Sequence, residues 1–288
     1  MTVLSPMKAA FEGFRVVRRE PAAVIVWMLL WLGALSLAAW SVAAGHRVVV
    51  SATPTYRSIS DIAGRLGTFA AGFMALFLLV WATTTVATFR AVLRPHERRW
   101  FFLRLGADEF RVAVMTVAAF VLVLVFGGVP AYLLYILVNP IMRAVPRFTR
   151  DIEQVGAFAT VCLDIWLGVR LSLLAVETFA ERRFHLTAYW PVTQGRFWYL
   201  FLCYVICFVL FFLLSFIVFV LGEVVFQIAG AGVGPGDLVR RTSVLGLAGL
   251  LAVLTASFFT ASSTLFCACQ AHAFRAIVGS GKAGVAPA

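Results

Sequence analysis

The side chains that could do chemistry in this sequence are few, and the most informative is an acid inside an apolar run. Asp164 follows Val155 by nine residues, about 14 Å along a helix and close to the middle of a bilayer if the run crosses one. Inserting a carboxylate there costs about 2.5–3.5 kcal/mol, so such a residue is a functional candidate by default. Two interpretations stay open. In the first, Asp164 has a structural role and either meets a hydroxyl or an arginine of another helix or stays protonated. In the second, it lines a path for an ion, a proton or a substrate.

Arg170 is the nearest basic residue to Asp164 along the chain. Their six-residue separation is a rotation of about 240° on an ideal helix, so the two side chains do not share a face. Arg170 lies near the end of the apolar run, where a long basic side chain can extend toward the membrane surface. The sequence therefore offers no partner for Asp164 on its own helix.

Arginines between the apolar runs form the second group of candidates. They lie in two basic, aromatic segments, FRAVLRPHERRW and AERRFHLTAYWPVTQGRFW, and are Arg98, Arg99, Arg182, Arg183 and Arg196. Guanidinium groups bind phosphate strongly, so these residues could bind an anionic lipid headgroup or the acidic face of a membrane-protein partner. The structural alternative is that the segments only anchor the chain at the membrane surface, through Trp100, Trp190, Trp198 and Tyr199.

Motifs for metal binding and catalysis are absent from the sequence. Cys267 and Cys269, near His272, are the closest approach to a metal site, but on a helix the two thiols point about 200° apart. The four histidines lie in separate segments, and no HExxH, GxSxG, Walker or GxGxxG pattern occurs. The five cysteines lie in or near apolar segments and are interpreted as small buried hydrophobes. We therefore expect no metal, no cofactor and no enzymatic activity.

The composition places these residues in a membrane. Hydrophobic residues make up 62% of the 288 residues and charged residues 13%, far from the roughly 45–50% and 25% of soluble domains. The net charge is +11, from 24 Lys and Arg against 13 Asp and Glu. Because the arginines lie between apolar runs, the expected partners are membrane lipids with anionic headgroups and not nucleic acid.

The apolar runs predict an all-α, polytopic bundle of six transmembrane helices, since about 20 apolar residues cross a bilayer. The expected spans, within a membrane domain at 22–278, are 22–44, 68–89, 112–138, 155–176, 199–226 and 244–266. Residues 1–21 are expected to form a cytoplasmic, interfacial amphipathic helix, and residues 279–288 a disordered tail. Gly127, Gly128 and Pro130 are expected to kink the third span.

The distribution of basic residues predicts the orientation. The N-terminus, the second and fourth connections and the C-terminus hold 16 Lys and Arg, whereas the other three connections hold 8. Basic residues concentrate on the cytoplasmic side, so both termini are expected in the cytoplasm, with the chain in the bacterial inner (plasma) membrane.

An internal repeat suggests how the spans are grouped. Residues 91–92 and 97–100 match 175–176 and 181–184 at a constant offset, and 274–278 echo 89–93. One interpretation is three related helical hairpins, each ending at the cytoplasmic face; the other is coincidence in a chain rich in arginine and alanine. Within the second basic segment, Glu181 could pair with Arg182, with Arg183 or with an arginine of the first segment.

The second basic segment also resembles a known family. Glu181 and the run Tyr189 to Trp198 are similar to a Glu followed by a Ser-Trp-x-Leu-Thr-x-Gly-x-Phe-Trp pattern in the glycerophosphoryl diester phosphodiesterase membrane-domain family, with departures at Tyr189 and Pro191. The resemblance implies a six-span membrane module with an N-terminal amphipathic segment. It implies no diesterase activity, because the His-Arg-Gly signature is absent: Val48 follows His46 and Arg47.

Two functions follow as expectations. The first is a non-catalytic membrane protein that binds lipid headgroups or a membrane partner and acts in envelope or lipid organisation. The alternative is a transporter or lipid-translocating protein that uses Asp164. An intramembrane enzyme would need at least two convergent reactive groups, whereas the sequence contains one isolated acid.

Overall fold

The computed structural model describes residues 5–50, 59–97, 99–130, 132–133, 136–137, 149–184, 193–231 and 237–283. These residues form helices and turns, with no strand among them. The helices are α1 (Pro6–Ala10), α2 (Glu12–Arg19), α3 (Pro21–Val50), α4 (Ile59–Leu93), α5 (Ala107–Val123), α7 (Thr149–Leu171), α8 (Leu174–Glu181), α10 (Phe197–Ala231) and α11 (Asp237–Ala283), with short segments η1 (Arg99–Phe102) and η2 (Leu124–Gly128).

Six helical stretches are long and apolar enough to cross a membrane. They are Pro21–Ser41, Ala71–Leu93, Trp100–Gly128, Gln154–Glu181, Phe197–Val225 and Ala248–Gly279. Each overlaps one of the expected spans, so the prediction of six apolar, membrane-length helices is confirmed. α11 continues to Ala283, so residues 279–283 of the expected disordered tail are helical, and the remainder of that tail lies outside the described residues.

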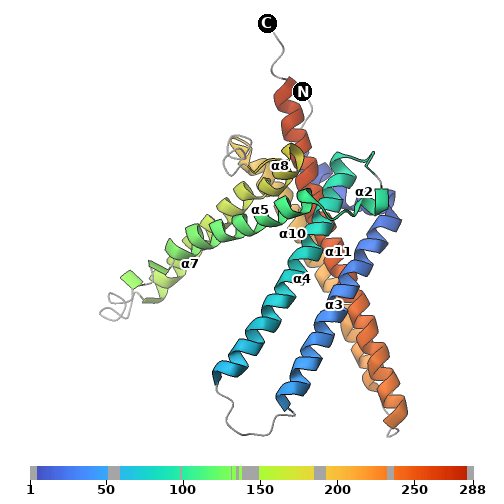
Figure 1. Cartoon of the computed structure of the whole chain (residues 1–288). Helices are drawn as coiled ribbons and strands as arrows, with labels where there is room; N and C mark the ends of the chain where they lie inside the picture. Colours follow the sequence, from blue (N-terminus) through green and yellow to red (C-terminus); the bar gives the residue numbers. More distant parts are fainter. Residues whose placement is uncertain are drawn as a thin grey trace.

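The six helices lie in two groups and not in one parallel bundle. In Figure 1, α3, α4, α10 and α11 run together, whereas α5 and α7 lie side by side and point away from that group. The turn at Ser172 and Leu173 separates α7 from α8, and α5 packs against α8. Hydropathy specifies which residues are apolar but not the angles at which helices cross, which is why the sequence did not predict this divergence.

The hydrophobic core lies where α3, α4, α8, α10 and α11 meet. Trp27, Phe89, Phe179 and Leu200 are fully buried there. Further along α10, large apolar side chains are exposed; Phe212, Phe216 and Phe219 belong to this set. Exposed apolar surface on a membrane-length helix suits contact with lipid tails, because lipid is as apolar as the side chains themselves.

The N-terminal region forms two short helices instead of the single expected one, with a turn at Phe11. The apolar side chains of Met7, Phe11, Phe14 and Val17 are exposed, whereas Ala9, Ala10 and Val16 are buried. Gly13 permits this packing, since a Cβ at that position would lie 2.8 Å from the Cα of Leu265 on α11. The backbone of α2 therefore lies directly on α11.

Candidate functional site: a charged cap, a buried acid and a cavity

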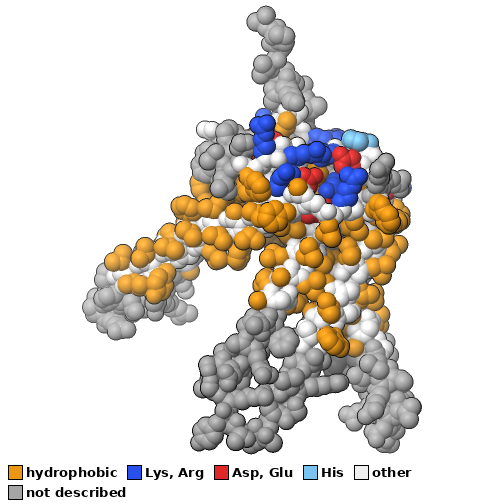
Figure 2. Space-filling view, viewed as in Figure 1, with side chains coloured by type: hydrophobic (Ala, Val, Ile, Leu, Met, Phe, Trp, Pro, Cys, Tyr) orange, Lys and Arg blue, Asp and Glu red, His pale blue; other side chains and the backbone are white. Residues whose placement is uncertain are grey.

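Charged side chains gather at one end of the molecule, which we name the charged cap. Its members are Glu12, Arg15, Arg19, Arg90, Arg94, Glu97, Asp108, Glu109, Arg111, Arg196, His272 and Arg275, together with Arg182 and Arg183 at the end of α8. Figure 2 shows Lys, Arg, Asp and Glu side chains gathered at the end where α2 and α8 lie, above the apolar surface of the long helices. This separation of charge from apolar surface is typical of a protein that crosses a bilayer.

Arg90 is the buried centre of the charged cap. Its Nη2 lies 2.6 Å from Glu109 Oε1 and 3.9 Å from Asp108 Oδ2, and its Nη1 donates a 2.9 Å hydrogen bond to the carbonyl of Phe102. The Arg90 and Glu109 side chains are only 4% and 6% exposed. A buried charge pair is stable only when both charges are hydrogen-bonded, and Glu109 also accepts from the backbone N–H of Gly106 at 3.0 Å. Arg90 thereby joins the end of α4 to the beginning of α5.

The segment that Arg90 contacts has an unusual backbone. Trp100, Phe101 and Phe102 have φ values of 50°, 57° and 65°, and the left-handed region costs roughly 1–2 kcal/mol for each non-glycine residue. Hydrogen bonds hold the segment in place: the Trp27 Nε1–H donates to the Phe101 carbonyl at 3.1 Å, and Arg90 donates to that of Phe102. Strain retained in this way marks a candidate functional segment.

Other arginines of the charged cap donate to main-chain carbonyls near helix ends. Arg94 lies 3.4 Å and 3.3 Å from the carbonyl oxygens of Phe179 and Ala180, and its guanidinium lies 4.7 Å from the centre of the Phe179 ring. Near the end of α4, Arg19 donates to Ala91 at 2.8 Å and Arg275 to Val92 at 3.4 Å. The last carbonyls of a helix lack helical partners, so these arginines stabilise the carboxyl ends of α8 and α4.

The arginines predicted to bind headgroups have different environments. Arg182 ends α8 in the left-handed region at φ 58°, and both Arg182 and Arg183 are exposed. Arg196 donates to the carbonyl of Ile277 at 2.8 Å, which is a structural role. Arg98 and the side chain of Arg99 lie outside the described residues. Among the three of these arginines whose side chains the structure describes, Arg182 and Arg183 are accessible to an external anion.

The structure describes three of the four predicted interface anchors. Trp100 and Trp198 are 82% and 76% exposed, and Tyr199 is half-buried against the core. Trp190 lies outside the described residues. Two exposed indoles beside the charged cap suit the membrane surface, where the ring contacts apolar groups and the N–H reaches water.

The two repeated basic segments are in contact, but not through the expected residue. Arg94, from the first segment, contacts the last turn of α8, which begins the second segment. Glu181, the expected partner of an arginine, is exposed, whereas Glu177 is buried on α8. The contact thus uses carbonyl oxygens and an aromatic ring, groups whose role depends on three-dimensional packing.

Asp164 packs against a π-helical turn in the third span. Its Oδ1 is buried and has no hydrogen-bond partner among the described residues. A Cβ on Gly127 would overlap this oxygen, so only glycine allows the approach. Gly127 belongs to η2, a π-helical turn just before Pro130, where the sequence predicted a kink. In the described part of the chain, the expected hydroxyl or arginine partner of Asp164 is not found.

Arg170 is directed elsewhere, as the helical spacing predicted. Its Nη1 donates to the hydroxyl of Thr193 at 3.1 Å, and its guanidinium lies 5.5 Å from the Trp166 ring. Cys267 and Cys269 likewise face different helices: the Cys267 thiol lies 3.5 Å from the Thr85 hydroxyl on α4, whereas Cys269 packs with the α10 cluster that contains Cys203.

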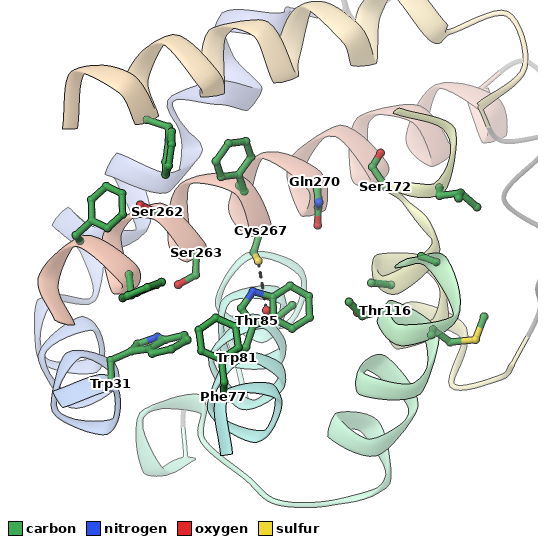
Figure 3. Close-up of a pocket in the computed structure, with 18 residues that line it drawn as sticks. Trp31, Phe77, Trp81, Thr85, Thr116, Ser172, Ser262, Ser263, Cys267 and Gln270 are labelled. Atoms are coloured by element: carbon green, nitrogen blue, oxygen red, sulfur yellow. Dashed lines mark hydrogen bonds between the residues drawn. The ribbon is translucent and has the colours of Figure 1, made fainter. Parts of the chain in front are cut away.

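A cavity of about 450 Å³ lies between the two groups of helices (Figure 3). Its walls come from α3, α4, α5, α10 and α11 and from the residues around the start of α8, and Asp164 does not line it. The cavity was not predicted from the sequence, although the spacing of residues on two helices indicates it. Phe77, Trp81 and Thr85 recur at four-residue spacing on α4, as do Phe259, Ser263 and Cys267 on α11, which places each set on one helix face.

The six long apolar helices place this chain in the class of multi-pass membrane proteins. Comparisons with models of protein families, with curated proteins and with solved structures return no match. The resemblance of Glu181 and the run Tyr189 to Trp198 to a membrane-domain family therefore stays a prediction, and most of that run lies outside the described residues.

Proposed function

We propose that this chain is a non-catalytic protein of the bacterial inner membrane that binds anionic lipid headgroups at its charged cap and acts in lipid or envelope organisation. The observation that carries the proposal is the division among the arginines. Arg90, Arg94 and Arg196 are bonded within the protein, whereas Arg182 and Arg183 are exposed at the end of α8. An exposed pair of guanidinium groups at the charged cap is suited to binding a lipid phosphate.

The proposed orientation puts the charged cap at the cytoplasmic surface. α2 lies at this end of the molecule, and α11 extends beyond it (Figure 1). The excess of Lys and Arg in the segments assigned to this side supports the same orientation. The exposed apolar face of α1 and α2, with Met7 and Phe14, would then lie in the headgroup region as an interfacial amphipathic element.

We also infer that the spans are three related hairpins that meet at the charged cap. The three echoed segments contribute to one core cluster: Phe89, Ala91 and Val92 from the first, Val176 from the second, and Phe274 and Ile277 from the third. A shared core of equivalent positions supports duplication over coincidence. A headgroup site at the charged cap would then be built from more than one hairpin.

The test removes the exposed pair of charges. Arg182→Gln with Arg183→Gln should weaken binding of phosphatidylglycerol by about fivefold for each arginine, since one basic residue near an anionic surface contributes about 1 kcal/mol. Native mass spectrometry of the protein released from nanodiscs of mixed phosphatidylglycerol and phosphatidylcholine measures the bound lipid.

The matched control is the pair Arg240→Gln and Arg241→Gln, at the end of α11 remote from the charged cap. Retention of phosphatidylglycerol should survive this change. Equal losses in both double variants would mean general attraction by net charge and would overturn a specific site at the charged cap.

A second candidate function is transport or lipid translocation through Asp164. The buried Oδ1 beside a π-helical turn favours it, because π-turns within α-helices are frequent at functional sites. Asp164→Asn separates the two: loss of substrate movement with normal amounts of folded protein supports translocation, whereas loss of folded protein supports a structural bond.

A further inference from the structure

The cavity between the helix groups has the size and lining of a ligand site. Its volume of about 450 Å³ falls within the roughly 300–1,000 Å³ of small-molecule pockets, which combine apolar walls with a few placed polar groups. Trp31, Phe77, Phe211 and Phe259 supply aromatic walls, and Ala119 of α5 faces them from the other helix group. These residues belong to the membrane-length helices, and none is part of the charged cap.

Three buried polar atoms in the wall have no hydrogen-bond partner among the residues that the structure describes. Trp31 is 1% exposed, yet its Nε1–H makes no hydrogen bond within the described part of the chain, and the same holds for the hydroxyls of Thr116 and Ser262. An indole nitrogen is a donor only, so it requires an acceptor atom. The Trp31 ring is held in place by Phe259, stacked at 5.0 Å, and by Phe77, edge-on at 5.2 Å. The donor is therefore fixed before any ligand arrives.

The depth of these groups limits the chemistry of the ligand. Trp31 lies near the middle of the 21-residue span Pro21–Ser41, and Thr116 and Ser262 also lie well inside their spans. Phospholipid ester groups stay at the membrane surface, whereas a ligand that reaches Trp31 must carry its acceptor oxygen into the hydrocarbon region. Such a ligand has to be uncharged, because burying a charge there is costly.

We infer that the cavity binds a neutral, membrane-soluble carbonyl compound with a planar ring, which is the chemistry of a membrane quinone. The ring packs among the aromatic side chains, and a carbonyl oxygen accepts from the Trp31 Nε1–H. Figure 3 shows Trp31 of α3 and Thr116 of α5 on different sides of the cavity, so these two donors, unpartnered among the described residues, belong to different helix groups. This inference uses none of the arginines of the charged cap and stands apart from the proposed function.

Binding is measured with decylubiquinone added to the full-length protein in nanodiscs, followed by extraction and quantification of the retained quinone. Saturable retention above that of empty nanodiscs is expected. Trp31→Phe keeps a ring and removes the donor, and should weaken binding by about two- to tenfold, the value of one net hydrogen bond. Ala119→Phe fills the cavity and should abolish saturable binding.

The matched control is Ala75→Phe, the same substitution at an exposed position of α4, which should bind as the unmodified protein does. Retention that only increases in proportion to the added quinone, or that is equal in Ala119→Phe and Ala75→Phe, overturns the inference. Full affinity in Trp31→Phe overturns the assigned hydrogen bond even if Ala119→Phe fails to fold. Equal displacement of the quinone by decane, which has no carbonyl group, would assign the cavity to acyl chains and overturn the inference.

Discussion

Arg90 has a structural role that its place in a basic segment does not reveal. Its guanidinium contacts Glu109 and Asp108 and the carbonyl of Phe102, so one side chain joins two helices and a strained segment. The sequence marks Arg90 as one basic residue among several at a helix end. Only the fold shows that it is buried and that it differs from the exposed Arg182.

Arg90→Met should lower the free energy of unfolding by about 3–5 kcal/mol, because it leaves the buried Glu109 carboxylate without its cation. The double change Arg90→Met with Glu109→Leu should recover most of that loss, since well-packed apolar groups can replace a buried ion pair. Denaturant titration in detergent, followed by helix content, measures both values.

Arg182→Met is the control, because an exposed arginine should change stability by no more than about 0.5 kcal/mol. If Arg90→Met proved no more destabilising than this control, the Arg90 contacts would not hold the charged cap together.

Among the helices, the third span contains two adjacent glycines, Gly127 and Gly128, that are not equivalent. Gly127 and Gly128 are adjacent in η2, but a Cβ at Gly127 would overlap Asp164, whereas one at Gly128 meets nothing within 4 Å. The π-helical turn therefore orients one glycine toward α7. The sequence predicts a kink here but does not specify which glycine contacts Asp164.

Gly127→Ala should destabilise the protein by about 1–3 kcal/mol, the usual cost of overpacking. Gly128→Ala should be neutral or stabilising by up to about 1 kcal/mol, because alanine is the better helix former. Thermal unfolding in detergent compares the two variants. In an Asp164→Ala background the effect of Gly127→Ala should largely disappear; an unchanged penalty there would show that the Asp164 contact is not its cause.

For the whole molecule, the number and approximate limits of the long helices could be predicted from the sequence, because a bilayer requires about 20 consecutive apolar residues. The sequence was also sufficient to place Asp164 and Arg170 on different faces, which follows from helical geometry alone. These features depend on local composition and spacing.

The remaining features depend on contacts between distant residues. The left-handed backbone at Trp100 to Phe102 requires Trp27, more than seventy positions earlier, and Arg94 reaches α8 across a similar separation. The divergence of α5 and α7, and the cavity that it leaves beside Trp31, depend on helix crossing. No periodicity in one segment specifies such pairings, so neither the cavity nor the partners of the arginines followed from the sequence.

A cryo-EM structure in nanodiscs containing phosphatidylglycerol would show whether the exposed arginines of the charged cap bind anionic lipid. We expect a headgroup phosphate within hydrogen-bond distance of the guanidinium groups of Arg182 and Arg183. A structure without a headgroup there, but with a continuous water-filled path reaching Asp164, would rule against headgroup binding and favour transport.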